Sequence, residues 1–281
     1  MEYRKINKIY HAPQVMMGDI ALRQAFPLRE LQQISPFILL HHFDFIMEPG
    51  NNKFNVPPHP HRGFCPITFM FEGSVEHNDS LGNHAVISDN EVQWINAGSG
   101  LIHSEIAAKK FVESGGRFQG IQLWINLKRA EKMLPPSYQS VTKNEIILFG
   151  KEGVEFRLVS GNYQGKKGPA NSDVITATLR MLPNTNYDLS FPAAQNVVLY
   201  ILEGSIEINQ QENAKQHDLV WFDQEDGEIK IKSIANSKLL VLSGLPIEEP
   251  LVSHGPFVMN SPQQILEAIT DYQDGKMGTM L

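Results

Sequence analysis

The sequence predicts an all-β protein made of two domains of similar construction. From Ile67 onward, short apolar runs return about every 8–12 residues with turn residues between them, which is typical of a β-sandwich or β-barrel. Two landmarks then recur in the same order: Phe71–Glu76 resembles Leu202–Glu207, and Asn90–Trp94 resembles His217–Trp221. Such a recurrence indicates a duplicated β-domain. The chain of 281 residues is long enough for two.

The boundary between the two domains is expected at Pro135 and Pro136. These prolines end a predicted helical turn over Lys128–Leu134, because proline cannot continue a helix. We therefore expect an N-terminal domain at residues 1–134 and a C-terminal domain at residues 137–281.

One short helix is predicted near the C-terminus, over Gln263–Tyr272. Ser261 is a suitable N-cap, Pro262 suits the first helical position, and Gln264 follows the cap by three residues. The apolar residues that would share one face of this helix are Ile265, Ile269 and Tyr272. We expect the helix to pack on a barrel rather than to carry out chemistry.

Composition narrows the class of protein. Apolar residues make up 42% and charged residues 20%, as in an ordinary globular protein. A formal charge of −7 argues against a dominant surface for nucleic acid or for anionic membranes. The longest apolar runs, such as Val197–Leu202, are far too short to span a bilayer, and the first residues lack the apolar core of a signal peptide. We expect a cytoplasmic protein that binds neither nucleic acid nor membrane.

Two pairs of metal-binding residue types lie two residues apart: His59 with His61, and His103 with Glu105. Alternate residues of a strand face the same side, so each pair would project into one interior. A His-x-His pair alone is often a surface turn or a hydrogen-bonded pair. Here, prolines on both sides of His59 restrain the backbone to an extended form. Three imidazoles and a carboxylate would suit a divalent transition metal.

The remaining histidines are weaker candidates. His41 and His42 are adjacent, so at most one of them could face a shared site, and structural or surface roles are expected for both. His77 and His84 flank a turn and are expected at the surface or in a loop. Gln122 is a candidate for contact with a metal ligand rather than with the metal.

The repeat suggests that only the first domain binds metal. Carried across it, His59 and His61 fall on Ser190 and Pro192. His103 and Glu105 fall on two lysines, Lys230 and Lys232, and a protonated lysine has no lone pair to donate. The second copy is therefore expected to be degenerate.

Six segments together resemble the pirin family of the cupin superfamily. They are His59–Phe64, Phe71–Gly73 with Glu76–Asp79, Gln93–Trp94, Ala97–Glu105, Gln122–Leu127 and Gly255–Asn260. The resemblance implies two cupin β-barrels packed together, a bicupin, with iron in the N-terminal barrel. It also implies that the iron is held at the positions of the pattern's three histidines and glutamate, which are His59, His61, His103 and Glu105.

Cys65, four positions after His61, departs from the usual cupin pattern, in which three or four residues separate the second histidine from a glutamate. Three roles are open for it: a soft fifth ligand, a redox-sensitive thiol near the iron, or a small buried filler. The cysteine in place of this glutamate argues against any activity that needs a second carboxylate beside the metal.

Three functions follow from the resemblance and the ligand set. The first is a dioxygenase acting on quercetin-like flavonols or related planar enols, in which two open positions on Fe(II) hold substrate and dioxygen and Glu105 acts as base. The second is a regulator without enzymatic activity, which binds a protein partner according to the state of its iron. The third is a metal with a structural role only. The residues alone would equally accept manganese, cobalt, nickel or copper, and a monomer is expected.

Overall fold

The computed structural model describes Glu2–Met280 and divides the chain into two compact units. Neither unit is contiguous in sequence. The N-terminal unit contains Gln14–Leu22, Pro36–Lys143 and the residues from Ile247 onward. The C-terminal unit contains the residues up to Pro13, Arg23–Ser35 and Asn144–Pro246. These units differ from the contiguous halves expected above, because the first residues of the chain belong to the C-terminal unit and the last residues belong to the N-terminal unit. The limits 1–134 and 137–281 remain a prediction for the two domains.

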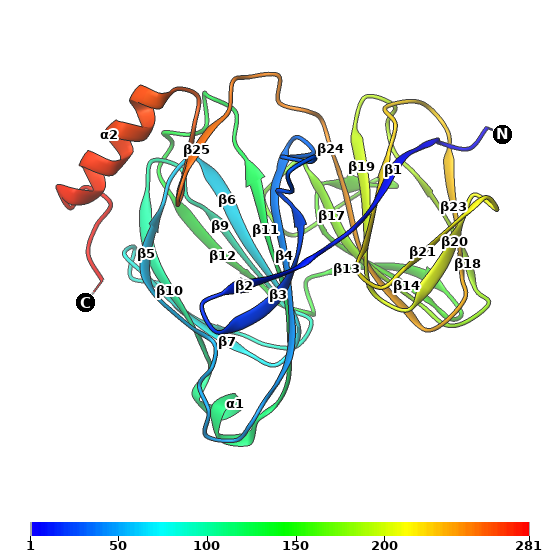
Figure 1. Ribbon diagram of the computed structural model, residues 1–281, viewed down its shortest axis with the longest axis horizontal. Helices are drawn as coiled ribbons and strands as arrows, with labels where there is room; N and C mark the ends of the chain where they lie inside the picture. The colour runs from blue at the N-terminus through cyan, green and yellow to red at the C-terminus, as the bar shows by residue number, and fades with distance from the viewer. Residues whose placement is uncertain (1, 281) are drawn as a thin grey trace. The chain divides into compact units, whose positions relative to one another are not determined.

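The N-terminal unit is built from two antiparallel sheets (Figure 1). The order of the larger sheet is β12-β9-β6-β11-β4-β3-β2, and that of the smaller sheet is β5-β10-β7-β8. The strands of the larger sheet are β2 (Gln14–Met17), β3 (Ile20–Phe26), β4 (Phe37–Met47), β6 (Phe64–Glu72), β9 (Val92–Asn96), β11 (Gly116–Asn126) and β12 (Ser137–Val141). Of β3, only the residues up to Leu22 belong to this unit. The strands of the smaller sheet are β5 (Asn55–His61), β7 (Val75–Asp79), β8 (His84–Ile87) and β10 (Leu101–Ala107).

Strand β10 shows how the sequence sets the inward face of the smaller sheet. Its residues alternate between buried and half-buried along the whole strand, beginning and ending with buried Leu101 and Ala107. His103 and Glu105 belong to the buried set, with only 0% and 2% of their surface exposed. The two-residue period of a strand therefore turns both polar side chains toward the interior.

The last part of the chain returns to the N-terminal unit and packs beside β5. Strands β25 (Val252–His254) and β26 (Phe257–Met259) form a hairpin. The amide of Val258 donates to the carbonyl of Arg62 at 3.0 Å, so β26 lies next to the end of β5. Helix α2 (Pro262–Gln273) follows, and the Ser261 hydroxyl accepts from the Gln264 amide at 3.3 Å. The predicted C-terminal helix and its cap are confirmed. A second short helix, α1 (Lys109–Ser114), was not foreseen.

The C-terminal unit also contains a seven-stranded and a four-stranded sheet, ordered β1-β22-β19-β24-β17-β14-β13 and β18-β23-β20-β21. The larger sheet consists of β1 (Ile6–His11), β13 (Ile147–Lys151), β14 (Val154–Ser160), β17 (Ile175–Met181), β19 (Asn196–Glu203), β22 (Asp218–Phe222) and β24 (Ser237–Gly244). The smaller sheet consists of β18 (Asn186–Ser190), β20 (Ser205–Ile208), β21 (Glu212–Lys215) and β23 (Glu228–Ser233), and a two-stranded ribbon is formed by β15 (Asn162–Tyr163) and β16 (Lys166–Lys167). The same pair of sheet sizes in both units agrees with a duplicated β-domain.

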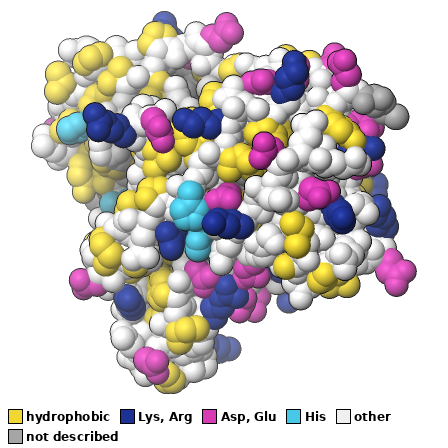
Figure 2. Space-filling model, turned by 45° about the vertical axis from the view of Figure 1, so that its right-hand side comes forward, with side chains coloured by type: hydrophobic (Ala, Val, Ile, Leu, Met, Phe, Trp, Pro, Cys, Tyr) yellow, Lys and Arg dark blue, Asp and Glu magenta, His cyan; other side chains and the backbone are white. Residues whose placement is uncertain are grey.

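No helix within Glu2–Met280 is long and apolar enough to cross a bilayer. On the face drawn in Figure 2, acidic and basic side chains are interspersed rather than gathered by sign.

Candidate metal centre

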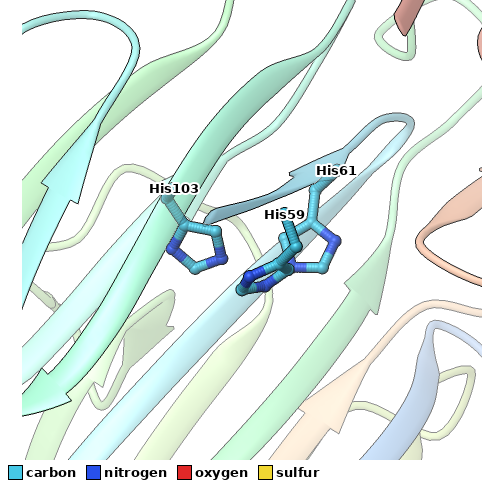
Figure 3. A group of neighbouring side chains, drawn as sticks. All are labelled: His59, His61 and His103. Carbon is cyan, nitrogen blue, oxygen red and sulfur yellow. The ribbon is translucent and has the colours of Figure 1, made fainter. Parts of the chain in front are cut away.

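Three of the four predicted ligands come together in the N-terminal unit. The ring nitrogens of His59, His61 and His103 that face one another all lie within 4.8 Å (Figure 3). Across the described part of the chain, this is the one group of three or more histidine, cysteine or acidic side chains close enough to hold a metal ion. His61 and His103 are buried and His59 is half-buried, so the cluster sits at the edge of the interior.

The local sequence explains why these rings converge. His59 and His61 share a face of β5, and the β5–β10 register places His59 directly opposite His103. Strand β5 is an edge strand, where Pro58 and Pro60 remove no hydrogen bond that the sheet interior needs. The ring centroids of His59 and His103 are 4.4 Å apart, and those of His61 and His103 are 5.0 Å apart.

The electrostatics of the cluster keep its buried rings neutral. Burial and the neighbouring His59 lower the pKa of His61 to about 3. Burial, together with the other histidines, lowers the pKa of His103 well below its ordinary value. Neutral imidazole offers a lone pair, and that is the form in which histidine binds metal.

Two features show that the residues present fit a metal ion. Nε2 of His59 and Nε2 of His61 face each other at 3.1 Å, so two nitrogens of the same kind are directed at one point. Nε2 of His103 is buried and has no hydrogen-bond partner among the described residues. A buried polar atom without a partner costs about 1–3 kcal/mol, and a metal ion would remove that cost.

Glu105 is buried beside the cluster but is held by hydrogen bonds. Its Oε1 accepts from Thr68 Oγ1 at 2.9 Å and from Gln93 Nε2 at 2.7 Å. Its Oε2 accepts from Gln122 Nε2 at 3.2 Å. No oxygen of Glu105 belongs to the group of facing nitrogens, so its role as a fourth ligand remains a prediction. Gln122 does contact a predicted ligand.

A mostly apolar cavity of about 250 Å³ lies against the cluster. Among its polar lining residues are His59, His61, Glu105 and Gln122. The other lining residues are Met17, Leu22, His41, Phe43, Phe54, Val56, Trp124 and Pro256. Burial lowers the pKa of His41 to about 4, so this ring also faces the cavity uncharged. The cavity has the composition of a small-molecule site, an apolar pocket with a few converging polar groups.

Cys65 faces away from the cluster. The ring of Phe64, the residue before it, packs edge-on against His61 with centroids 5.0 Å apart. Successive residues of β6 point to opposite sides, so Cys65 points the other way. Burial, and the nearby Glu131, raise the pKa of the Cys65 thiol to about 12. Of the three roles left open for Cys65, these observations favour the buried filler.

His77 was expected at the surface, and this is wrong. Its side chain is 0% exposed, and its Nδ1 lies 3.5 Å from Nδ1 of His103. Its Nε2 donates to Asp79 Oδ2 at 3.0 Å. The signal was present in the sequence, because Val75, His77 and Asp79 alternate as one face of a strand would. The turn residues that follow Asp79 led to the expectation of a surface position instead. His84 is exposed, as expected.

The counterparts expected in the second copy were wrong by one residue. In the N-terminal unit, Val75 pairs with Ala107 and His77 with Glu105. In the C-terminal unit, Ile206, the repeat partner of Val75, pairs with Ser233, and Ile208 pairs with Ile231. Glu105 therefore corresponds to Ile231.

The same register fixes the other counterparts in the second copy. His103, two residues before Glu105, corresponds to Ile229. Leu189 of β18 lies opposite Ile229 of β23, as His59 of β5 lies opposite His103 of β10. The positions expected were Ser190, Pro192, Lys230 and Lys232, none of which belongs to the core. Leu189, Ile229 and Ile231 are all core residues of the C-terminal unit. Hydrocarbon thus fills the place that the metal-binding side chains occupy in the first copy.

Comparison with known proteins matches both halves of the chain to one family. The family model described as pirin matches residues 19–125, and the model of the pirin C-terminal cupin domain matches residues 176–278. Human pirin is 30% identical over 264 residues, which cover 92% of this chain and 88% of the relative. A pirin-like protein of Solanum lycopersicum is 35% identical, covering 93% and 88%.

A solved structure matches over the entire length. The crystal structure of quercetin 2,3-dioxygenase from Acinetobacter baumannii is 31% identical, covers 100% of both chains and has a TM-score of 0.93. The predicted fold class, an all-β chain of two cupin domains with a short C-terminal helix, is confirmed.

Proposed function

Because the chain belongs to the pirin family, we propose that its histidine cluster and Glu105 hold one divalent transition metal. We further propose that the adjacent cavity takes a small planar enol or flavonol for oxidation by dioxygen. The observation that carries this proposal is the position of the cluster. Nε2 of His103 is buried without a partner among the described residues, and His59 and His61 line the apolar cavity.

Fe(II) is the metal we propose, from the family resemblance. Three imidazoles and a carboxylate would leave open positions on an ion of octahedral preference, where it would polarise a bound oxygen and exchange electrons with dioxygen. The same ligand set accepts other divalent transition metals, so the metal is identified by experiment.

The cavity walls supply the fit to substrate. Phe43, Phe54 and Trp124 offer aromatic surface to a planar ring, and the apolar lining excludes water. A volume of about 250 Å³ is at the small end for a ligand site, so the proposed substrate is compact. The quercetin 2,3-dioxygenase named among the similar structures supports a flavonol as the first compound to test.

Glu105 is the proposed base. A carboxylate has about four lone-pair sites, and the hydrogen bonds from Thr68, Gln93 and Gln122 use three of them. These three donors fix the orientation of the carboxylate. One lone-pair site remains, so at any moment Glu105 can either bind the ion or accept the proton of a substrate hydroxyl that enters through the cavity. Gln122, which also lines the cavity, would then orient both the Glu105 carboxylate and the substrate hydroxyl.

The test is turnover by protein loaded with iron under anaerobic conditions. Quercetin and then dioxygen are added, and we expect a ring-opened product together with carbon monoxide. A His103→Ala variant should lose both, whereas His84→Ala, which changes an exposed histidine, should keep them. A fully iron-loaded protein that consumes no flavonol would contradict the dioxygenase proposal.

One observation favours the regulator as a second candidate. Arg62 follows His61 directly, and its guanidinium is 2.9 Å from Asp271 of helix α2. A change of iron state at His61 therefore has a short route to a helix that is partly exposed. Pull-downs with ferrous, ferric and apo protein test this reading, and an identical set of bound proteins in all three would count against it.

A further inference from the structure

We propose that Asp79 and His77 are positioning residues that fix which ring nitrogen of His103 carries its proton. The proposal rests on the proposed metal centre, because the purpose of fixing that proton is to leave Nε2 of His103 free for the ion. Neither Asp79 nor His77 is a predicted ligand. They form a buried chain that leads from a turn to the cluster.

Asp79 can only be an acceptor in this chain. Its Oδ1 accepts from the amides of Leu81 and Asn83, at 2.9 and 3.0 Å. Its Oδ2 lies 2.9 Å from Asn83 Nδ2 and 3.0 Å from His77 Nε2. A carboxylate that receives this many N–H groups is ionised and has no proton of its own to give. His77 Nε2 must therefore carry the hydrogen and donate it.

The state of His77 then determines the state of His103. The proposal includes a His77 ring that carries a single proton. With that proton on Nε2 and given to Asp79, Nδ1 of His77 is an acceptor. That nitrogen lies 3.5 Å from Nδ1 of His103, which must supply the hydrogen. His103 is then protonated on Nδ1, and its Nε2 carries a lone pair.

This assignment accounts for a feature that is otherwise unexplained. Nε2 of His103 has no hydrogen-bond partner among the described residues. In Figure 3 it is the nitrogen of His103 that is directed toward His59. The chain Asp79–His77–His103 directs a lone pair to that point without using Asp79 or His77 as a ligand. Metal-binding histidines are commonly held in this way through their other ring nitrogen.

The surroundings of His77 hold its ring in place. His77 is 0% exposed and stacks on Tyr138, with centroids 4.4 Å apart and an angle of 17° between the planes. The ring is therefore not free to turn away from the two groups that it joins.

The Asp79→Asn variant gives the sharpest test, because it should reverse the direction of both hydrogen bonds of His77. The carbonyl oxygen of the substituted side chain would keep the two amide donors of the turn, which places its NH₂ group toward His77. His77 Nε2 must then accept, its Nδ1 becomes the donor, and His103 receives on Nδ1. The proton of His103 moves to Nε2, where it occupies the proposed metal position.

The first measurement needs no metal. Nitrogen NMR of histidine-labelled apo protein distinguishes the two neutral tautomers, and the His103 signal is assigned from its absence in His103→Gln. We expect His103 protonated on Nδ1 in the wild type and on Nε2 in Asp79→Asn. A wild type with His103 protonated on Nε2, or an unchanged tautomer in Asp79→Asn, would overturn the proposal.

The second measurement is the affinity for Fe(II) under anaerobic conditions, by competition with a chelator. We expect Asp79→Asn to bind about 10–100-fold more weakly than the wild type, as for other groups that orient a metal ligand. Glu76→Gln is the matched control, because it removes a carboxylate from the same strand where it pairs with exposed His84. Equal affinity in Asp79→Asn and Glu76→Gln would refute the proposal. A wild type that binds no metal would instead refute the proposed function, and the tautomers would still test the chain.

A second variant guards against failure of Asp79→Asn to fold. His77→Phe keeps an aromatic ring to stack on Tyr138 but removes both hydrogen bonds. His103 should then show both tautomers, and the affinity for Fe(II) should fall less than in Asp79→Asn, because part of the protein still has the lone pair on Nε2. A single Nδ1-protonated form in this variant would contradict the role given to His77.

Discussion

His59 lies directly opposite His103 in the β5–β10 ladder, and their ring centroids are 4.4 Å apart. The register then shifts, so that Glu105 pairs with Val56 rather than with Pro57. The two predicted ligands of β10 have different partners. His103 remains with the other histidines, whereas Glu105 reaches the polar side chains of the larger sheet. This local geometry is the source of the first two predictions.

Metal content should depend on each histidine of the cluster. We expect about one divalent ion per chain in wild-type protein purified anaerobically, and less than about a tenth of that in His59→Ala and in His103→Ala. Elemental analysis of each preparation is the measurement. His84→Ala serves as the control for the loss of a histidine, because His84 is exposed on β8. Full metal content in either cluster variant would show that the ring is not a ligand.

Glu105→Gln tests the carboxylate separately from the histidines. The substitution keeps the length of the side chain but removes its charge and sets an NH₂ group against donors from Thr68, Gln93 or Gln122. If Glu105 is the fourth ligand, affinity for Fe(II) should fall at least about 10-fold, as a carboxylate that favours the divalent ion is lost. Gln122→Ala removes only one of its donors and should weaken binding less. Equal affinity of Glu105→Gln and wild type would leave a site of three histidines only.

The sequence was sufficient for the fold class and for placing His59 beside His61, because both depend on local periodicity. The spacing of two between His59 and His61 puts them on one face of one strand, whatever its neighbours are. It was insufficient wherever register between strands decides the answer. The offset of the repeat made Lys230 the counterpart of His103, whereas strand pairing places Ile229 there.

Burial of polar residues was likewise hard to foresee from the sequence. His77 stands next to a turn, and its ring is covered by Tyr138 and His103, which come from other strands. Thr68 and Gln93, which hold Glu105, come from β6 and β9 and have no sequence signal of their own. Contacts between segments that are distant in the sequence decide whether such residues are buried.

Cys65 should be inert in the folded protein. Burial raises the pKa of its thiol to about 12, so almost no thiolate, the reactive form, exists at about pH 8. We expect iodoacetamide to label only a small fraction of the native protein in the time that labels all of it in denaturant. Cys65→Ala should also leave the metal content unchanged. Rapid labelling of the native protein, or loss of metal in the variant, would restore the redox or ligand role.

Lys132 should contribute to stability through its three hydrogen bonds. Its ammonium is buried and donates to the carbonyl of Gly63 at 2.6 Å, to Asn126 Oδ1 at 2.6 Å and to the carbonyl of Val258 at 3.0 Å. Lys132→Met would leave three buried acceptors without this donor, so we expect a loss of about 3 kcal/mol in the free energy of unfolding at pH 7. Chemical denaturation measures it, with Lys128→Met as the control at an exposed position. Equal stability of the two variants would show that the buried acceptors find other partners.

The same lysine should give the protein a pH dependence of known sign. Burial lowers the pKa of Lys132 from 10.5 to about 8. Between these values the unfolded chain holds the proton and the folded chain has released it, so raising the pH favours the folded state. A shift of this size corresponds to about 3 kcal/mol across that window. Other groups titrate in the same window, so the quantity to measure is the difference in unfolding free energy between wild type and Lys132→Met. That difference should grow as the pH rises from about 8. A difference that stays constant would mean that Lys132 keeps its proton in the folded protein, held by its three acceptors. A difference that shrinks would mean that folding raises the pKa of Lys132 instead of lowering it.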